Sequence, residues 1–472
     1  MTDNLIRVRF APSPTGYLHL GSLRVALFNW LYARHNKGQF IIRIEDTDLN
    51  RSESKYVDSI LIPLKWVGIE SDEPITFQSQ RLELYNKVLN YMLEKNLAYR
   101  CFCSEKESNQ NVEYKKYEGT CRNRLINQID LQSPHVIRFK LPENIDKIEF
   151  NDLIRGDITF DIDQFDDFVI FRSDGMPTYN FAVVVDDNSM NITHILRGEE
   201  HISNTPKQIL LYQACGFRVP LFGHLPLILS PDGGKLSKRH AATSVDFYQK
   251  EGFLPDALCN YLVRLGWAHG DQEIFSKEEM IKYFTLENVS KHGAIFDIKK
   301  LEWVNGVYIR NSSSQYLFDY ITENIDADVF KNLNHWSQDK ILKSIDLYKD
   351  RVRTLKELLL FIVELYNEPH NLELHNLDQW ANENSISILK KLISSLDMQE
   401  NFSHENISLD IKILCKEFGI KLPEIAQPIR LALTGKVSSP GIFDIIILLG
   451  KKESIQRIKV FVEFLSNVVR KH

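Results

Sequence analysis

The order of patterns in the first 45 residues constrains the fold more than any other feature. Residues 6–10 alternate apolar side chains with arginine, as a short strand does. Prolines and a glycine within residues 11–16 end this strand, because proline lacks an amide donor and glycine favours a turn. Apolar residues then recur at helical spacing over 23–31, and residues 40–44 form a second apolar run. This strand–helix–strand order predicts the start of a parallel α/β sheet.

The middle of the chain changes character after residue 100. A cysteine cluster and strand-like runs at 135–140 and 167–171 interrupt the first pattern. Strand patterns resume at 192–196 and 225–229, on either side of a helical stretch. We therefore predict that residues 101–190 form a module inserted into the sheet domain.

Beyond residue 246 the pattern is mainly helical. Thr354, followed three residues later by Glu357, predicts a capping box ahead of an amphipathic helix. The polar run at 311–316 is the best candidate for a linker between domains. The tail of the chain is therefore predicted to be all-helical.

Charge and hydropathy narrow the function classes. A formal net charge of −6 argues against a protein that binds nucleic acid through bulk positive charge, so RNA binding would depend on local patches. The N-terminus lacks a basic-then-apolar leader. Apolar runs such as residues 445–449 are far shorter than the ~20 residues of a membrane span. We therefore expect a cytoplasmic protein without a membrane partner.

Two short strings suit a nucleotide. The first, residues 12–22, leaves a predicted strand and opens a helix, where backbone donors and the helix dipole favour a phosphate. Within it, His19 can donate to a phosphate oxygen, and Gly21 lets a nucleotide approach the backbone. The second string, residues 233–240, carries basic residues behind two glycines, and such a loop can close over a triphosphate. The alternatives are a Pro-Gly turn with a capping serine and a solvated basic loop.

Together the two strings resemble the paired nucleotide signatures of class I aminoacyl-tRNA synthetases. The flanking sequence is similar, nearly end to end, to the bacterial glutamyl-tRNA synthetase family. The segments that carry this resemblance are Arg9-Phe10-Ala11-Pro12-Ser13-Pro14-Thr15-Gly16, Arg43-Ile44-Glu45-Asp46-Thr47-Asp48, Tyr179-Asn180-Phe181-Ala182, Val185-Asp186-Asp187, Arg197-Gly198-Glu199-Glu200-His201, Leu265-Gly266-Trp267 and Ala426-Gln427-Pro428-Ile429-Arg430-Leu431-Ala432-Leu433-Thr434-Gly435.

The resemblance implies a two-step reaction and a domain plan. ATP with Mg²⁺ would convert L-glutamate to glutamyl-adenylate, and the glutamyl group would pass to tRNA-Glu with release of AMP and diphosphate. It also implies a monomer with no DNA partner, and it leaves open whether tRNA-Gln is charged as well. The implied domains are a Rossmann-like catalytic domain in two halves (1–100 and 191–245), an inserted acceptor-end-binding module (101–190), a stem-contact helical region (246–313) and a helical anticodon-binding domain (314–472).

A pocket for free glutamate needs arginine for the carboxylates and an acidic group for the ammonium. Arg9, Glu45 and Arg197 supply these groups at the ends of predicted strands, where parallel sheets place ligands. The alternative for residues 43–48 is a strand edge with solvated charges. Val183 stands where some family members carry a polar contact, so selectivity is expected to depend more on the arginines.

The resemblance assigns residues to each substrate. The implied glutamate-binding residues are Arg9, Ala11, Ser13, Glu45, Tyr179 and Arg197. The implied catalytic residues are His19, Lys235 and Lys238. The implied ATP-binding residues are Pro12, Ser13, Pro14, Thr15, Gly16, His19, Gly21, Ser22, Lys235, Leu236, Ser237, Lys238 and Arg239.

Cys101, Cys103 and Cys121 resemble the zinc-binding insertion of some bacterial members. In those members a His or Cys follows the third Cys by two residues, but Asn123 stands there in this chain and is a poor zinc ligand. We therefore favour ordinary thiols. The alternative is a zinc ion held by the three thiolates, with His135 or a water as the fourth ligand.

Three other functions fit parts of the sequence. An enzyme that modifies a tRNA base with activated glutamate would lack the long helical tail. A glutaminyl-tRNA synthetase would carry a β-barrel there. A non-catalytic RNA-binding protein would not need both nucleotide strings, so a glutamate–tRNA ligase remains the favoured interpretation.

Overall fold

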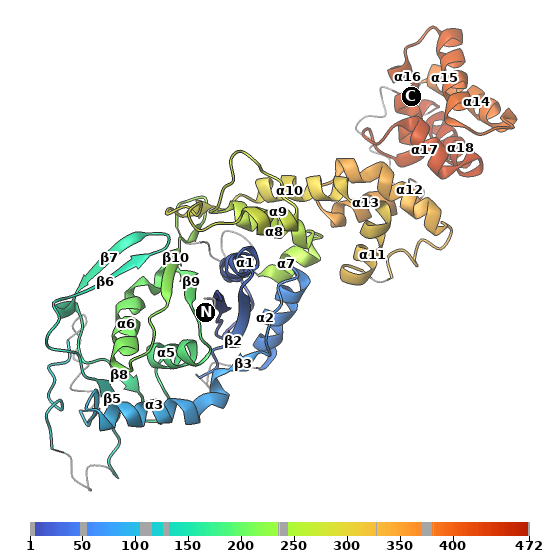
Figure 1. Ribbon diagram of the computed structural model, residues 1–472. Helices are drawn as coiled ribbons and strands as arrows, with labels where there is room; N and C mark the ends of the chain where they lie inside the picture. The colour runs from blue at the N-terminus through green and yellow to red at the C-terminus, as the bar shows by residue number, and fades with distance from the viewer. Residues whose placement is uncertain are drawn as a thin grey trace. The chain divides into compact units, whose positions relative to one another are not determined.

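The computed structural model describes residues 5–47, 54–103, 116–125, 132–234, 236, 244–326, 328–367, 369, 380 and 382–470 (Figure 1). The chain divides into two compact units. The first comprises residues 1–248 and 255–301, and the second comprises residues 249–254 and 302–472. Among the described residues, no helix has an apolar stretch long enough to cross a bilayer.

All described strands lie in the first unit. They are β1 (Arg7–Phe10), β2 (Gln39–Ile44), β3 (Thr76–Phe77), β4 (Ala98–Cys101), β5 (Val136–Phe139), β6 (Lys147–Asp152), β7 (Gly156–Asp161), β8 (Val169–Phe171), β9 (His194–Gly198), β10 (Leu221–Leu225), β11 (Ile228–Leu229) and β12 (Ala294–Ile295). The predicted strands at 6–10, 40–44 and 192–196 thus form, with ends shifted by one or two residues.

The main sheet is parallel, as the strand–helix–strand pattern predicted. One half has the order β1-β2-β3, and the other has β7-β6-β10-β9, in which only the β6–β7 pair is antiparallel. The two halves meet where the Thr193 amide donates to the Arg7 carbonyl oxygen at 3.0 Å. The strand order therefore reverses between β1 and β9. Ligands bind beyond the carboxyl ends of the strands at such a reversal.

Residues 101–190 contribute strands to two different sheets. A separate antiparallel sheet has the order β4-β5-β8, whereas the β6–β7 hairpin adds to the main sheet because β6 pairs with β10. The predicted domain limits stay predictions. What the structure adds is that a strand from the predicted insertion forms part of the main sheet.

The helices of the first unit pack on its sheets or on one another. They are α1 (Leu20–His35), α2 (Ser54–Trp66), α3 (Leu82–Glu94), α5 (Tyr179–Ser189), α6 (Thr205–Ala214), α7 (Val245–Lys250), α8 (Pro255–Arg264) and α9 (Lys277–Tyr283), with short 3₁₀ turns η1 (Gln78–Arg81), η3 (Ile162–Gln164) and η4 (Glu199–Asn204). Helix α1 packs on β1, β2 and β9. Its buried side chains include the predicted apolar set Leu23, Ala26, Leu27, Trp30 and Leu31. Helices α3, α5 and α6 share a core with side chains of β9 and β10, which holds α5 beneath the strand reversal.

The second unit is helical, as predicted. Helix α10 (Ile298–Asn311) leads into it, followed by α11 (Ser314–Asn324), α12 (Gln338–Tyr348), η5 (Lys349–Arg351), α13 (Leu355–Tyr366), α14 (Glu383–Met398), α15 (His404–Phe418), α16 (Leu422–Thr434), α17 (Ile442–Leu449) and α18 (Lys451–Val469). The run at 311–316, predicted as a linker, is mostly helical and leaves only residues 312–313 between α10 and α11.

The predicted capping box at α13 forms only in part. The Thr354 hydroxyl accepts from the Glu357 amide at 3.2 Å. The Glu357 carboxylate accepts from the Arg353 amide at 2.7 Å, one residue before the expected donor. Both caps still satisfy amide groups at the helix start, so the helix begins where the sequence places it.

Candidate active site

A cleft of about 980 Å³ lies at the carboxyl ends of β1 and β9, where the strand order reverses. It brings together most of the residues that the sequence assigned to glutamate and ATP. Of those residues, it is lined by Arg9, Ala11, Pro12, Ser13, Thr15, Gly16, His19, Gly21, Ser22, Glu45, Tyr179, Arg197 and Leu236. Pro14 is buried and is not among the lining residues. Lys235, Ser237, Lys238 and Arg239 lie outside the described residues.

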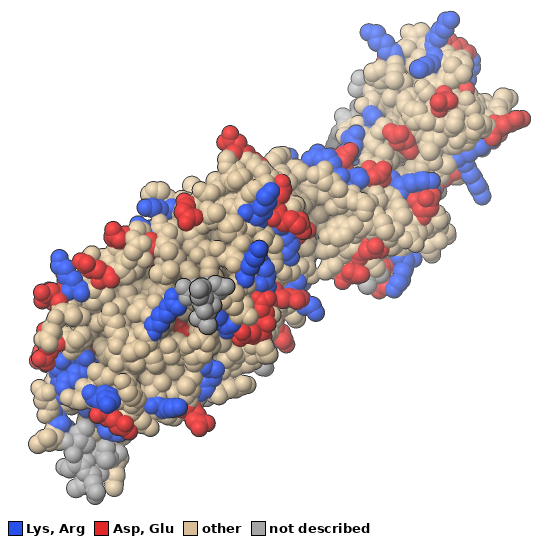
Figure 2. Space-filling view, viewed as in Figure 1, with Lys and Arg blue, Asp and Glu red and all other residues tan. Residues whose placement is uncertain are grey.

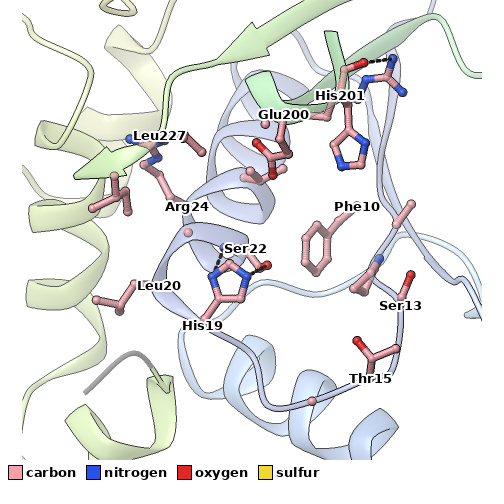
Figure 3. Close-up of a pocket in the computed structure, with 18 of the residues that line it drawn as sticks. Phe10, Ser13, Thr15, His19, Leu20, Ser22, Arg24, Glu200, His201 and Leu227 are labelled. Carbon is pink, nitrogen blue, oxygen red and sulfur yellow. Dashed lines mark hydrogen bonds between the residues drawn. The ribbon is translucent and has the colours of Figure 1, made fainter. Parts of the chain in front are cut away.

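One wall of the cleft is the loop that leads from β1 into α1. His19 caps α1, because its Nδ1 accepts from the Ser22 amide at 3.2 Å, and its Nε2 lies 2.9 Å from the Ser22 hydroxyl (Figure 3). A Cβ on Gly21 would meet the His19 ring at 3.1 Å, so glycine leaves room for the ring. The N-terminus of α1 and the His19 imidazole therefore face the cleft together, which suits a phosphate.

Beneath the cleft lies a buried ionic network centred on Asp187 of α5. Asp187 Oδ1 accepts from Arg43 Nη1 at 2.6 Å, and Arg9 Nε lies 3.3 Å from each Asp187 oxygen. Arg43 also donates to Glu45 Oε1 at 3.1 Å. Although burial opposes ionisation, the charges of Arg43 and Arg9 hold the pKa of Asp187 below its usual value. No described residue accepts from the terminal nitrogens of Arg9, whose side chain lines the cleft.

Glu45 stands at the end of β2 and faces the cleft. Its amide donates to the Pro12 carbonyl at 2.9 Å, which ties the nucleotide loop to the second strand. Burial raises the pKa of Glu45, and the charges of Arg43 and Arg9 only partly offset this. A cation in the cleft would therefore stabilise the ionised form of Glu45, as the ammonium group of an amino acid would.

Arg197, at the end of β9, is a buried cation without a carboxylate partner among the described residues. It is 5% exposed. Its Nη1 donates to Gln208 Oε1 at 2.9 Å, and its Nη2 donates to Thr205 Oγ1 at 2.8 Å. Burial lowers the pKa of Arg197. A buried guanidinium held by neutral acceptors favours binding of an anion, because an anion would compensate its charge.

The second wall carries residues that the sequence did not single out. Glu200 and His201, which follow β9, point into the cleft opposite the loop that bears Ser13 and Thr15 (Figure 3). His201 Nδ1 lies 3.3 Å from the Tyr179 hydroxyl. Burial, reinforced by the charge of Arg197, lowers the pKa of His201 to about 4, so its ring is neutral near pH 7. These residues belong to a recognised motif, but the motif alone gave them no role.

The three cysteines predicted as a cluster come together in space. The Sγ atoms of Cys101, Cys103 and Cys121 lie within 4.8 Å of one another, and the Cys103–Cys121 distance is 3.5 Å. The Tyr117 hydroxyl lies 3.4 Å from Cys101 Sγ. His135 is not part of this group: its Nδ1 lies 2.8 Å from the Ser133 carbonyl oxygen, and its ring packs against Phe102.

Comparisons with known proteins decide the family. The family model for the catalytic domain of class I tRNA synthetases (E and Q) matches residues 5–303, and a model for an anticodon-binding domain matches residues 317–462. The glutamate–tRNA ligase of Pelobacter propionicus is 43% identical over 466 residues, which is 97% of this chain and 98% of that protein. The chain belongs to the glutamate–tRNA ligase family. It is therefore a class I aminoacyl-tRNA ligase by descent.

Further relatives support the same assignment over the full chain. Glutamate–tRNA ligase 1 of Campylobacter hominis is 45% identical over 465 residues, or 96% of this chain and 98% of that protein. A crystal structure of a glutamate–tRNA ligase from Elizabethkingia meningosepticum, in complex with its amino acid, superposes with a TM-score of 0.88 at 34% identity. It covers 98% of this chain and 99% of that one. Membership of the family confirms the resemblance inferred from the motifs.

Proposed function

We propose that this cleft activates L-glutamate with ATP and transfers it to the 3′-terminal adenosine of tRNA-Glu. The observation that supports this most directly is the charge arrangement at the strand reversal. Arg9 and Arg197 present guanidinium groups to the cleft, and Glu45 presents a carboxylate. Glutamate carries two carboxylates and one ammonium, so its charges complement all three side chains.

Different parts of the cleft would bind the two substrates. The N-terminus of α1, with His19 and Ser22, would hold the phosphates of ATP, since oriented amides and a partial positive charge favour anions there. The arginines and Glu45 would hold glutamate beside it, with Tyr179 on the same wall. We retain the full sets of glutamate- and ATP-binding residues predicted from the sequence as part of this proposal.

The first chemical step needs no general base. The α-carboxylate of glutamate is ionised at neutral pH and would attack the α-phosphate of ATP in line. The bond from that phosphorus to the bridging oxygen breaks, which releases pyrophosphate and leaves glutamyl-adenylate. Mg²⁺, taken up with ATP as part of the substrate, offsets charge on the phosphate oxygens. A terminal ribose hydroxyl of tRNA then displaces AMP, so catalysis is mostly orientation and charge stabilisation.

Lys238→Ala is expected to lower kcat for adenylate formation by roughly 100- to 1,000-fold while changing KM for glutamate by less than about threefold. The reason is that an ammonium on this loop would stabilise charge that develops on the phosphates only during the reaction. Pre-steady-state kinetics of pyrophosphate release would measure both constants. A variant with normal kcat and only a raised KM would contradict this role for Lys238.

Exchange of labelled pyrophosphate into ATP tests the proposed function. We expect exchange with glutamate and tRNA-Glu together, and none when either tRNA or glutamate is omitted, since the family typically requires tRNA for activation. Glutamine and aspartate serve as matched amino acid controls. Absence of exchange under every condition would favour a non-catalytic RNA-binding protein. Parallel charging assays with tRNA-Glu and tRNA-Gln would decide whether the second tRNA is also a substrate.

RNA binding must depend on local charge. On the face shown in Figure 2, Lys and Arg are interleaved with Asp and Glu, and the whole chain has a net charge of −6. Contacts with tRNA would therefore come from particular side chains in the inserted module and in the anticodon-binding domain. The monomeric state and the cytoplasmic location stay predictions.

The cysteine cluster favours the zinc alternative that the sequence left open. In a tetrahedral site with Zn–S bonds of about 2.3 Å, sulfur atoms lie about 3.8 Å apart. The three sulfurs lie at comparable distances. Burial and the neighbouring thiols raise the pKa of Cys103 to about 12, so a cation would stabilise thiolates here. Cys101, Cys103 and Cys121 would hold the ion, with the Tyr117 oxygen or a water as the fourth ligand.

Protein purified without chelator is expected to carry about one zinc ion per chain, and Cys121→Ala is expected to lose more than roughly nine-tenths of it. Plasma mass spectrometry of the purified protein measures the metal directly. Cys415→Ala is the matched control, because Cys415 stands apart from the cluster and should leave the zinc content unchanged. Wild-type protein free of zinc would show that the cysteines are ordinary thiols.

A further inference from the structure

Three buried side chains form a chain of hydrogen bonds that ends at Arg197. Arg197 Nε donates to His224 Nε2 at 3.1 Å. On the other side of the ring, His224 Nδ1 lies 2.6 Å from Asp152 Oδ2. Asp152 and His224 are 2% and 0% exposed, and neither lines the cleft. The three residues belong to β9, β10 and β6, so these hydrogen bonds run across neighbouring strands of the main sheet.

The directions of these hydrogen bonds fix the state of the His224 ring. Nε2 accepts a hydrogen bond from Arg197 Nε and therefore cannot carry a proton itself. Nδ1 must then carry the ring proton, and it donates a hydrogen bond to the Asp152 carboxylate. Burial lowers the pKa of His224. Burial opposes ionisation of Asp152, but the hydrogen bonds from His224 and from the Arg155 and Ile154 amides together lower the pKa of Asp152. The ring is thus neutral, with one tautomer.

The Asp152 carboxylate is itself held in one orientation. Its Oδ1 accepts from the backbone amides of Ile154 at 3.0 Å, Arg155 at 2.8 Å and His224 at 3.2 Å. Only Oδ2 faces the His224 ring. A charged acceptor therefore selects the His224 tautomer, and that tautomer presents an acceptor to Arg197.

The Arg197 plane is fixed on three sides as a result. Thr205 and Gln208 accept from its terminal nitrogens, and His224 accepts from Nε. All three partners are neutral, so they orient the guanidinium while no described counterion neutralises its charge. An alternative partner such as a carboxylate would also orient Arg197, but it would compete with the substrate for that charge.

We propose that Asp152 and His224 are positioning residues for the amino acid site: they hold Arg197 in the orientation that binds a carboxylate of glutamate. This inference rests on the proposed function of Arg197. It assigns a role to a residue of the predicted insertion, since Asp152 lies at the end of β6, which pairs with β10 in the main sheet. Neither residue touches the substrate, so both act through Arg197.

Two substitutions of His224 separate this role from a purely structural one. His224→Gln places an amide oxygen near the Nε2 position, so it can still accept from Arg197, but it loses the Asp152 contact. His224→Asn places an amide nitrogen near the Nδ1 position, so it can still donate to Asp152, but it leaves Arg197 Nε without an acceptor. Leaving a buried charged donor unpaired is expected to raise KM for glutamate by about 10- to 100-fold in His224→Asn. We expect less than about fivefold in His224→Gln.

Asp152→Asn tests the choice of tautomer. The three backbone donors keep an oxygen at the Oδ1 position, so the amide nitrogen faces His224 Nδ1 and favours the other tautomer. His224 Nε2 would then carry a proton toward Arg197 Nε, and two donors would face each other. We expect KM for glutamate to rise about 10- to 100-fold, with KM for ATP unchanged within about twofold. In a His224→Gln background the same substitution should add little, because no ring remains to change its tautomer.

Pyrophosphate exchange with glutamate as the varied substrate measures these constants, and circular dichroism with thermal unfolding verifies that each variant is folded. Asp157→Asn, on the exposed side of the same hairpin, is the matched control and should behave like the wild type. The inference is overturned if folded Asp152→Asn keeps a wild-type KM for glutamate, or if His224→Asn is tolerated while His224→Gln is not. Failure of the wild type to exchange would instead reject the proposed function.

Discussion

Replacing Arg197 with alanine is expected to lower kcat/KM for glutamate by roughly 30- to 5,000-fold. That range corresponds to the roughly 2–5 kcal/mol lost when one partner of a buried, hydrogen-bonded charge pair is truncated. The physical reason is that a substrate carboxylate would enter the cleft without the cation that compensates its burial. No described carboxylate pairs with Arg197, so its full charge is available to the ligand.

Steady-state exchange kinetics at varied glutamate and fixed ATP would measure this loss. Arg172→Ala is the control, since Arg172 is an exposed arginine that pairs with nearby Asp174. We expect the control to remain within about twofold of the wild type, because exposed ion pairs contribute little. If folded Arg197→Ala kept kcat/KM within threefold of the wild type, glutamate binding would have to depend on Arg9 instead.

Asp187→Asn is expected to lower the free energy of unfolding of the first unit by about 3–5 kcal/mol. The substitution removes the charge that two buried arginines share, and Arg43 in particular has no route to solvent. Unfolding should begin on the order of 10 °C lower in a calorimetric scan. Asp174→Asn is the matched control at an exposed pair, where a loss below about 1 kcal/mol is expected. Equal losses in both variants would contradict a stabilising role for the buried network.

The same network gives stability a defined dependence on pH. Because the pKa of Asp187 is lowered in the folded protein, its contribution is complete above the unfolded value of about 3.9. The contribution is lost as the pH falls through the lower folded value. Acid unfolding of the wild type should therefore be steeper than that of Asp187→Asn, which lacks the titrating group.

Local pattern was sufficient to predict the elements that hold the nucleotide loop. The strand at 6–10, the turn through Gly16 and the helix that begins near Ser22 all follow from periodicity and from proline and glycine. The predicted ends of β1, β2 and β9 placed Arg9, Glu45 and Arg197 near one edge, and the structure brings all three into one cleft. Strand ends in a parallel sheet make this prediction dependable, because they converge whatever the loops do.

Partners distant in sequence could not be predicted in this way. Arg43 was singled out only as part of a motif, and nothing local indicates that Asp187 of α5 is its counterion. Asp152 gave no signal, since its proposed role depends on β6 pairing with β10 within the main sheet. Val183, expected near the substrate by resemblance, is fully buried and does not line the cleft. For the zinc alternative, the sequence offered His135 or a water as the fourth ligand, whereas the fold brings the Tyr117 hydroxyl to the thiols.

The separation between Arg43 and Asp187 also has a consequence during synthesis. The two residues are 144 positions apart. At about 5–20 residues per second, the ribosome adds Asp187 roughly 7–30 s after Arg43. During that interval, Glu45 is the partner that the described part of the β1–α1–β2 segment supplies for an arginine that will be fully enclosed. The first half of the sheet therefore reaches its final charge balance only when the second half has been translated, which ties the folding of the two halves into one event.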